Sequence, residues 1–261
     1  MSPGRLIVLE GSDGSGKTTQ LKLLAKRLDA IGHEVAIFDF PQYEQPSAYF
    51  VSKYLSGGYG KADDINPYTA SLFYALDRFE AAPAIRAALD DGKIVLSNRY
   101  VGANMAHQGG KFKHAEEQRG FFIWEDSLEF EILGIPRPSV NIYLRVPAEI
   151  SQALITERAK ADGQQLDEHE ANLDHLKHAV ATYDRLCQLF PKDFKAIDCV
   201  QDGQLLSITA INNRLWEVVK PILPQKETPP EAAAVSGKAV EGGGEGNTSC
   251  QGTQYSGKLV V

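Results

Sequence analysis

A glycine-rich segment near the N-terminus carries residue types that bind phosphate groups. The segment GSDGSGKT runs from Gly11 to Thr18 and matches the pattern G-x-x-x-x-G-K-[ST]. Its glycines permit a tight turn in which successive backbone N–H groups point at phosphate oxygens, and the N-terminus of a following helix adds positive potential. The segment predicts a phosphate-binding loop (P-loop) for a nucleoside triphosphate. A glycine-rich turn without a ligand is disfavoured, because a strand pattern precedes the loop and a helical pattern follows it.

The end of this loop supplies a charge and a metal ligand. Lys17 would place its ammonium group against the β and γ phosphates, and the Thr18 hydroxyl would bind Mg²⁺. The expected ATP-binding residues are Gly11, Ser12, Asp13, Gly14, Ser15, Gly16, Lys17, Thr18 and Thr19. GTPases, ATPase motors and small-molecule kinases all use such a loop, so other residues must identify the acceptor.

Further residues with binding chemistry follow strand patterns or share a helix face. Arg99 comes directly after the apolar run IVLSN and would emerge beside the P-loop, where a guanidinium can hold a transferring phosphoryl group. Phe40 and Tyr43 follow another strand pattern, at the end where ligands collect in parallel sheets. Tyr74 and Arg78 lie four residues apart, so a ring and a guanidinium can converge on one ligand. The alternative for this pair is a core tyrosine and a surface arginine.

The framework that must position these residues is an α/β fold. Short apolar runs alternate with longer amphipathic segments, and this rhythm indicates a parallel sheet covered by helices on both faces. Five strands are predicted, over residues 6–10, 34–38, 94–98, 140–146 and 194–198. The fold class is therefore that of a doubly covered parallel sheet.

Helices are predicted between these strands. Leucines at helical spacing predict a helix over residues 21–31, with Gly32 as its C-terminal stop. Asn66 and Pro67 predict the N-cap and first residue of a second helix, which Pro83 should bend or end. Further helices are predicted over residues 121–133, 148–160, 170–190 and 204–219.

Composition bounds the domain organisation and the class of partner. The chain has 261 residues, of which 43% are hydrophobic and 23% charged, enough for one large domain over residues 1–224. Residues 225–261 are rich in Pro, Gly, Glu, Ser and Ala and predict a disordered C-terminal tail. A net charge of -7 argues against a nucleic acid polymer as partner, because a polyanion requires a basic stripe. A small nucleotide stays compatible with this charge.

The sequence predicts a cytoplasmic protein with no membrane partner. No apolar run reaches the roughly 18 residues of a membrane span, and the first residues lack the pattern of a signal peptide. The three cysteines, Cys187, Cys199 and Cys250, show no metal-ligand spacing and no disulfide framework. Reduced thiols are the expected state.

Five segments, spread from residue 5 to about residue 220, together resemble the thymidylate kinase family. They are EGSDGSGKTT, FPQY, LFYALDRFE, NRYVGAN with the following MAHQ, and ERAKADGQQLDEHE. Their order and spacing are specific in combination. The resemblance implies a P-loop NTPase fold, a nucleoside monophosphate kinase core with a five-stranded parallel sheet and a mobile LID, and a homodimer formed through the helices that cover the sheet.

The resemblance also implies roles for residues of the acceptor site. Tyr74 matches an aromatic residue that stacks on thymine, and Arg78 an arginine that contacts the acceptor base and phosphate region. Asn104 matches an amide that reads the Watson–Crick edge of thymine. The implied acceptor-binding residues are Asp13, Phe40, Tyr43, Tyr74, Arg78, Arg99, Asn104, His107, Gln108, Asp167 and Glu170. His107 stands where many members carry a tyrosine that crowds the 2′ position of the sugar; an unremarkable histidine at the pocket rim or facing solvent is the alternative.

The LID is expected over residues 157–170, where it would close over the phosphates. Arg158 is its best candidate for bridging phosphate oxygens, because the P-loop itself carries Asp13 and Ser15 and no arginine. A solvated helix face is the alternative for this charged run. In the resembling family the residue at position 98 is an aspartate that helps to organise Mg²⁺, and Asn98 replaces it here.

The reaction predicted from these residues is phosphorylation of thymidine monophosphate by ATP with Mg²⁺, a step towards dTTP. Lys17, Arg99 and Arg158 would act by alignment and charge stabilisation, because the acceptor oxygen is already anionic. Two alternatives stay open. One is a kinase for another deoxynucleotide or a deoxynucleoside; the other is a nucleotide-binding paralogue with impaired catalysis.

Overall fold

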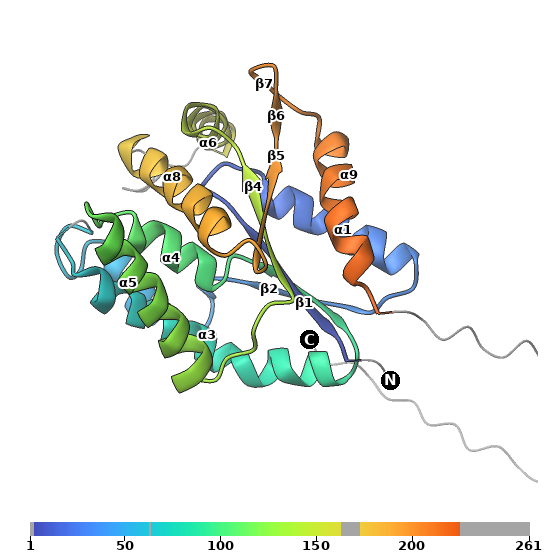
Figure 1. The fold of residues 1–261 in the computed structure, drawn as a ribbon, viewed down its shortest axis with the longest axis horizontal. Coiled ribbons are helices and arrows are strands. Elements are labelled where there is room, and N and C mark those ends of the chain that lie inside the picture. Colours follow the sequence, from blue (N-terminus) through green and yellow to red (C-terminus); the bar gives the residue numbers. More distant parts are fainter. Residues whose placement is uncertain (1–2, 63, 163–172, 225–261) are drawn as a thin grey trace, which may run out of the picture. The chain divides into compact units, whose positions relative to one another are not determined.

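The computed structural model describes residues 3–62, 64–162 and 173–224, and Figure 1 traces them as a ribbon. All of these residues belong to one compact unit, Met1–Gln225. The predicted tail, residues 225–261, lies outside the described residues, as does most of the expected LID. The fold below is therefore that of the expected kinase domain.

Five parallel strands form the central sheet, in the order β2-β3-β1-β4-β5. They are β1 (Arg5–Glu10), β2 (Val35–Asp39), β3 (Ile94–Asn98), β4 (Val140–Arg145) and β5 (Phe194–Asp198). Each lies within one residue of its predicted range, so the predicted α/β class and the five strands are confirmed. Since β1 is central, the P-loop that follows it lies in the middle of the carboxyl edge of the sheet.

Helices cover both faces of the sheet (Figure 1). One face is covered by α1 (Lys17–Ala30) and α9 (Ile208–Val219). The other is covered by α3 (Pro67–Asp90), α4 (Val101–Gly109), α5 (Ala115–Asp126) and α8 (Leu173–Leu189). The remaining elements are η1 (Pro46–Ala48), α2 (Tyr49–Leu55), η2 (Ser127–Ile132), α6 (Ala148–Asp162), β6 (Val200–Gln201), β7 (Gln204–Leu205) and η3 (Lys220–Ile222).

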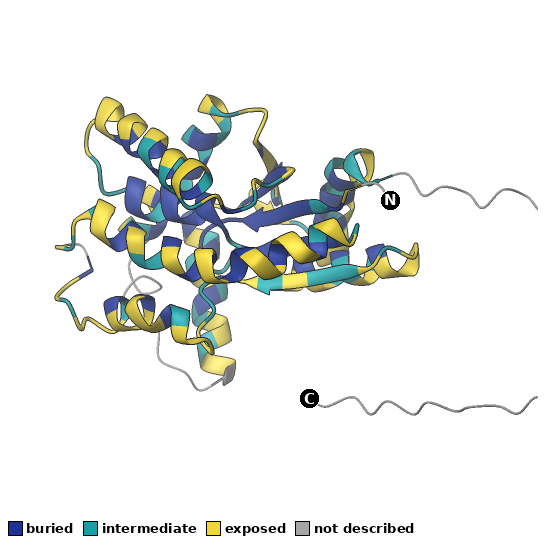
Figure 2. Ribbon diagram, turned by 90° about the horizontal axis from the view of Figure 1, so that it is seen from below, coloured by how far each residue is buried: buried dark blue, intermediate teal, exposed yellow. Residues whose placement is uncertain are grey.

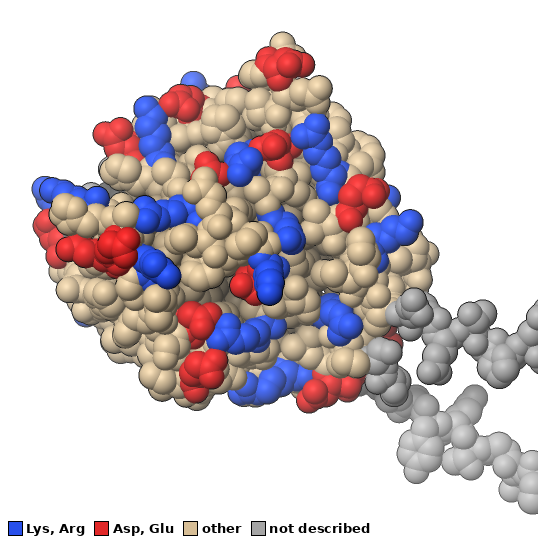
Figure 3. Space-filling model, viewed as in Figure 1, with Lys and Arg blue, Asp and Glu red and all other residues tan. Residues whose placement is uncertain are grey.

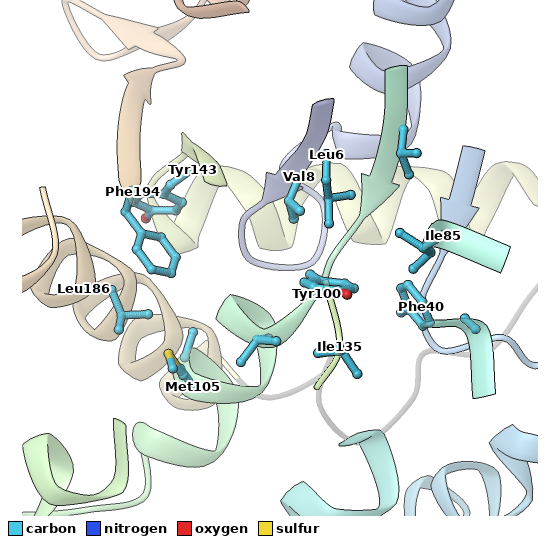
Figure 4. Close-up of a cluster of buried hydrophobic side chains, with 14 of the residues drawn as sticks. Leu6, Val8, Phe40, Ile85, Tyr100, Met105, Ile135, Tyr143, Leu186 and Phe194 are labelled. Carbon is cyan, nitrogen blue, oxygen red and sulfur yellow. The ribbon is translucent and has the colours of Figure 1, made fainter. Parts of the chain in front are cut away.

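Alternation along the strands divides the core into two layers. In β1, Leu6 and Val8 pack with the helices of the α3 side, a cluster shown in Figure 4, whereas Ile7 and Leu9 pack with α1 and α9. Figure 2 shows the buried sheet between helices whose outer sides are exposed. Both faces of the inner strands β1, β3 and β4 are thus removed from water, which explains their near-continuous apolar sequences, whereas the edge strands β2 and β5 stay partly exposed.

Helix α3 begins as predicted and continues through Pro83. Asn66 caps the helix as expected, because its side-chain oxygen accepts a hydrogen bond from the Tyr68 N–H at 2.9 Å. Pro83 does not end the helix, which continues to Asp90. Ala82 and Ile85 on either side of the proline are fully buried, so core packing offsets the backbone hydrogen bond that proline removes.

Helix α4 was not predicted from the sequence, and α9 begins later than predicted. Eight of the nine α4 residues are buried, so the segment lacks the polar and apolar alternation that marks a surface helix. Gln204, predicted to begin the last helix, lies in β7 instead. It belongs to a hairpin whose turn residues Asp202 and Gly203 both adopt positive φ angles, as a type I′ turn requires.

Within the described part of the chain, no helix is both long enough and apolar enough to cross a membrane. On the face of the molecule seen in Figure 3, lysine and arginine side chains are interspersed with aspartate and glutamate. Several basic groups gather near the middle of that face.

Candidate active site

The P-loop joins the end of β1 to the first residue of α1. Gly14 and Gly16 adopt φ angles of 74° and 83°, which L side chains rarely occupy, and a Cβ at Gly14 would lie 2.5 Å from the Ser151 carbonyl oxygen. Lys17 folds back over the loop, and its Nζ donates to the carbonyl oxygens of Gly11 (3.0 Å) and Ser12 (2.8 Å). The loop is therefore held closed by the same ammonium group that the sequence assigns to phosphate.

Lys17 is buried among other charges. Its burial, followed by repulsion from Arg99, lowers the pKa of Lys17 to about 7, although the carboxylate of Asp13 acts in the opposite direction. Asp13 responds differently. Burial alone would raise its pKa, but the positive charges of Arg99 and Lys17 outweigh burial and hold that pKa below its usual range. Asp13 is thus ionised across the physiological range, whereas Lys17 is poised to exchange a proton.

Arg99 lies at the end of β3 in a left-handed backbone conformation, with φ of 65°. Two hydrogen bonds hold this conformation: the Arg99 N–H donates to Leu9 O at 2.9 Å, and Ser97 Oγ donates to Arg99 O at 2.7 Å. The turn aims the guanidinium back across the sheet edge, where Nη2 pairs with Asp13 and Nη1 donates to Gly11 O at 3.3 Å. Arg99 therefore lies against the P-loop, as its position after the strand predicted.

Two cavities meet at this ion pair. The larger, about 590 Å³, runs along the P-loop from Asp13 to Gln20 and is bounded by Arg158 and by Leu205 and Leu206. The smaller, about 110 Å³, is lined by Phe40, Pro41, Tyr43, Leu55, Tyr74, Arg78, Tyr100, Ala103, Asn104, His107 and Gln108. Asp13 and Arg99 line both. A phosphoryl group that passes from one cavity to the other would pass beside them.

The floor of the smaller cavity holds a buried charge cluster. Arg78 on α3 is only 2% exposed and forms a double hydrogen bond with the carboxylate of Glu129, through Nε (2.6 Å) and Nη2. Its Nη1 donates to Tyr100 O at 3.4 Å. Glu125 lies alongside, with Oε1 3.9 Å from Arg78 Nη2. Burial, and then the negative charge of Glu129, raise the pKa of Glu125 well above its usual range.

The Asn104 side chain is held by two neighbouring helices. Its Nδ2 donates to Ser71 O on α3 at 3.3 Å and to Glu125 Oε1 on α5. Both amide hydrogens are therefore used, and the oxygen is the group left for a ligand. That oxygen has only a long contact from Ser71 Oγ (3.5 Å), so the amide faces a ligand as an acceptor.

His107 forms part of a chain of polar groups on the other side of the smaller cavity. Arg99 Nη1 lies 3.0 Å from His107 Nε2, and His107 Nδ1 lies 3.1 Å from His175 Nε2 on α8. Since arginine can only donate, His107 Nε2 accepts and Nδ1 carries the proton that it shares with His175. The solvent-facing alternative for His107 is wrong, because the ring lines the cavity and is held on both sides.

A third polar group lies where β2 and β3 end side by side. Asp39 and Asn98 are paired in register, and Asn98 Nδ2 donates to Asp39 Oδ1 at 2.8 Å and to Thr18 Oγ1 at 3.5 Å. Asn98 Oδ1 is buried and has no hydrogen-bond partner among the described residues. The family pattern has a carboxylate at position 98; here the neighbouring strand β2 supplies one, that of Asp39.

The structure gathers most of the residues predicted from the sequence. All the acceptor-site candidates that the structure describes line the smaller cavity, including Tyr74 and Arg78. Because Arg78 is buried, the alternative of a surface arginine is wrong. Ser15, Lys17, Thr18, Thr19 and Arg158 line the larger one, while Gly11 and Ser12 hold Lys17. Asp167 and Glu170 lie outside the described residues.

Sequence reasoning missed several polar residues around the site, most of them buried. Glu10 is fully buried and accepts hydrogen bonds from Tyr100 N, Ala103 N and Tyr183 Oη, so it anchors the turn that carries Arg99. The other missed residues are Asp39, Ser71, Glu125, Glu129 and His175. A signal existed for Asp39, which ends a strand as Asn98 does, but Glu125 and Glu129 look like ordinary acids of a surface helix.

A P-loop beside a second cavity, on a β2-β3-β1-β4-β5 parallel sheet, defines a P-loop phosphotransferase with separate donor and acceptor sites. Comparison with known proteins identifies the group more closely. The thymidylate kinase family model matches residues 9–207. The chain belongs to the thymidylate kinase family.

Named relatives agree with this assignment. The chain is 31% identical to a thymidylate kinase of Mycobacterium tuberculosis, over 69% of this chain and 85% of the relative. It is also 31% identical to a thymidylate kinase of Caulobacter vibrioides, over 80% of this chain and 94% of the relative. The solved structure of thymidylate kinase from Candida albicans has a similar fold, with a TM-score of 0.65 at 21% identity, covering 85% of this chain and 93% of that one.

Proposed function

We propose that this chain transfers the terminal phosphoryl group of ATP to the 5′-phosphate of thymidine monophosphate, giving ADP and thymidine diphosphate. The observation that carries the proposal is the Asp13–Arg99 pair, which lies at the junction of the P-loop cavity and a second cavity lined by aromatic and polar side chains, in a chain of the thymidylate kinase family. An acceptor phosphate oxygen attacks the γ phosphorus, and the bond to the ADP oxygen breaks. No covalent enzyme intermediate is required.

On the donor side, ATP would lie in the larger cavity. Its phosphates would take the Lys17 ammonium away from the Gly11 and Ser12 carbonyl oxygens that it now contacts. The apolar residues Leu205 and Leu206 offer a wall for the adenine base. Arg158 faces the same cavity from α6 and would bridge phosphate oxygens, with Asp167 and Glu170 further along the expected LID, residues 157–170.

On the acceptor side, the base would lie between the ring of Tyr74 and the buried polar floor. Thymine presents an N3–H donor, which matches the Asn104 oxygen with its single long contact from Ser71 Oγ, and a carbonyl at C4, which matches a remaining N–H of Arg78. Phe40 and Tyr43 would bound the base and sugar, and His107 with Gln108 would bound the sugar. Cytosine would present an acceptor at N3 and meet the Asn104 oxygen unfavourably.

Mg²⁺ would enter with ATP. Thr18, the buried and unpartnered oxygen of Asn98, and the carboxylate of Asp39 are oxygen groups suited to this ion and lie together at the P-loop. Among the described residues no group of three histidine, cysteine, aspartate or glutamate side chains could hold a metal alone, which fits an ion held mainly by phosphates. The bound ion would neutralise charge on the β and γ phosphates.

The proposal includes a homodimer in the cytoplasm. Leu72, Leu76 and Phe79 form an exposed apolar stripe on α3, at 41%, 47% and 45% exposure. A second copy of the same stripe would cover it by antiparallel helix packing. The reduced thiols of Cys187 and Cys199 agree with a cytoplasmic location, and cell fractionation would test it.

The deciding experiment measures ATP consumption with a panel of nucleoside monophosphates and nucleosides. We expect kcat/KM for thymidine monophosphate to exceed that for cytidine, adenosine and guanosine deoxynucleotides and for thymidine. Lys17→Ala serves as the background control, and we expect at least about a hundredfold loss of kcat in a folded protein. A nucleoside as the best acceptor, or ATP binding without ADP release, would overturn the proposed reaction.

A further inference from the structure

The Asn104 amide can face the acceptor cavity in either of two ways, and the choice determines which base fits. With its oxygen towards the cavity it accepts the N3–H of thymine; with its NH₂ group towards the cavity it would donate to N3 of cytosine. The two orientations have nearly the same shape. Something behind the amide must therefore select one of them.

Two acceptors lie behind Asn104. One is the backbone carbonyl of Ser71, which accepts Asn104 Nδ2 at 3.3 Å, and the other is Glu125 Oε1. Glu125 is fully buried and Asn104 is 4% exposed, so water cannot replace either partner. A reversed amide would set its oxygen against the Ser71 carbonyl and lose its donor to Glu125, which is unfavourable in a buried site.

Glu125 keeps this role because Glu129 carries the negative charge of the cluster. Glu129 forms the double hydrogen bond with Arg78, which leaves Glu125 without a strong cationic partner of its own. Its second oxygen, Oε2, is buried and has no hydrogen-bond partner among the described residues. Glu125 therefore engages Asn104 through Oε1 alone, which acts as the acceptor.

We propose that Glu125, which no sequence pattern assigned, is the positioning residue that fixes the Asn104 amide with its oxygen towards the base and so selects thymine over cytosine. This inference rests on the proposed function. Glu125 does not line the cavity and would reach the base through Asn104, since its other charged contact, Arg78 Nη2, lies 3.9 Å away and is held by Glu129. Glutamine, which has the shape of a protonated glutamate, should replace it; methionine, with similar volume and no acceptor oxygen, should not.

The test compares kcat/KM for deoxythymidine and deoxycytidine monophosphates in Glu125→Met, Glu125→Gln and wild type. We expect Glu125→Met to lower the thymidine-to-cytidine ratio by about tenfold or more and Glu125→Gln to keep it within about threefold, with KM for ATP unchanged in both. Glu117→Gln, on the exposed side of α5, is the matched control and should leave the ratio unchanged. If Glu125→Met does not fold, Glu125→Asp withdraws the same acceptor and should lower the ratio in the same direction.

A double-mutant cycle separates positioning from a general structural role. In an Asn104→Ala background, Glu125→Met should have no further effect on the ratio. A ratio that is unchanged in Glu125→Met, or an effect that persists without Asn104, overturns the inference. A wild-type protein that does not phosphorylate thymidine monophosphate overturns the proposed function instead, so the two failures are distinguishable.

Discussion

Lys17 couples the protonation state of the free protein to nucleotide binding. Its pKa of about 7 in the free protein results from burial and from Arg99, whereas phosphate oxygens beside the ammonium would raise it. Above pH 7 the free protein therefore holds fewer protons at this site than the complex does. ATP binding must take up a proton in that range, and affinity must fall as the pH rises.

We predict that the ATP dissociation constant rises roughly fivefold to tenfold between about pH 7.5 and about pH 8.5, with uptake of most of one proton. Calorimetry in two buffers of different ionisation enthalpy measures the uptake directly. Lys17→Met should bind ATP more weakly and show no uptake from this site. Equal proton uptake by the variant and the wild type would contradict the prediction.

A second prediction at the level of single residues concerns the stability of the buried charge cluster of Arg78, Glu125 and Glu129. Glu125→Gln should reduce the free energy of unfolding by less than about 1 kcal/mol, because burial and Glu129 already raise the pKa of Glu125, and glutamine has the same shape and keeps an acceptor oxygen for Asn104. Adding Glu129→Gln removes both possible counter-charges and leaves Arg78 buried and unpaired. We expect the double variant to lose about 3–5 kcal/mol in urea unfolding. A loss of similar size in both variants would show that Glu125 is ionised.

At the scale of elements, the ends of β2 and β3 place a carboxylate and an amide side by side. Asp39 and Asn98 occupy adjacent register positions beside Thr18. The family pattern has the carboxylate on the second of these strands, and here it is on the first. Because both strands end at the P-loop, a carboxylate on either one can act on a cation bound with ATP.

We predict that Asp39→Asn raises the Mg²⁺ concentration needed for half-maximal rate, and that adding Asn98→Asp restores it. Asn98→Asp alone should lower that concentration, because a second carboxylate joins the first. The ratio of acceptor preferences should not change, since neither residue lines the acceptor cavity. Manganese binding with a non-hydrolysable ATP analogue, followed by EPR, is a check independent of turnover. Unchanged binding in Asp39→Asn would exclude it from the metal site.

Helix α6 places Arg158 in the lining of the larger cavity, together with the first residues of α1. We predict that Arg158→Ala lowers kcat by about a hundredfold with little change in KM for thymidine monophosphate, because the guanidinium would act on transferring charge. Lys160→Ala, two residues along the same helix, is the matched control and should stay near wild type. Equal losses in the two variants would mean that α6 supplies only a general positive field.

At the scale of the whole molecule, we expect a second copy of the chain to cover the exposed apolar stripe of Leu72, Leu76 and Phe79 on α3. We predict a dimer in sedimentation velocity, and a monomer when Leu76→Glu puts a charge in the middle of the stripe. Leu189→Glu is the control, because Leu189 is a comparably exposed leucine (38%) on α8. A monomeric wild type, or loss of the dimer in the control, would reject the stripe as the interface.

The sequence by itself determined the elements of this fold and the ends of the strands where ligands bind. The P-loop, the five strands and Arg99 after β3 follow from short-range patterns, because turn chemistry, period-two burial and strand ends are properties of neighbouring residues. The family pattern added expected roles for Asn104 and Arg78, and both residues line the smaller cavity. Helix α4 escaped prediction because burial on all sides erases its periodicity.

Only the tertiary structure decided how these residues are held. Ser71, Asn104 and Glu125 come from three helices, and no local pattern records that they meet. The same is true of Asp39 beside Asn98 and of His107 beside His175, which are far apart along the chain. A hydrogen bond or a proton in a buried site depends on every neighbour within a few ångströms, and those neighbours are set by packing and not by sequence separation.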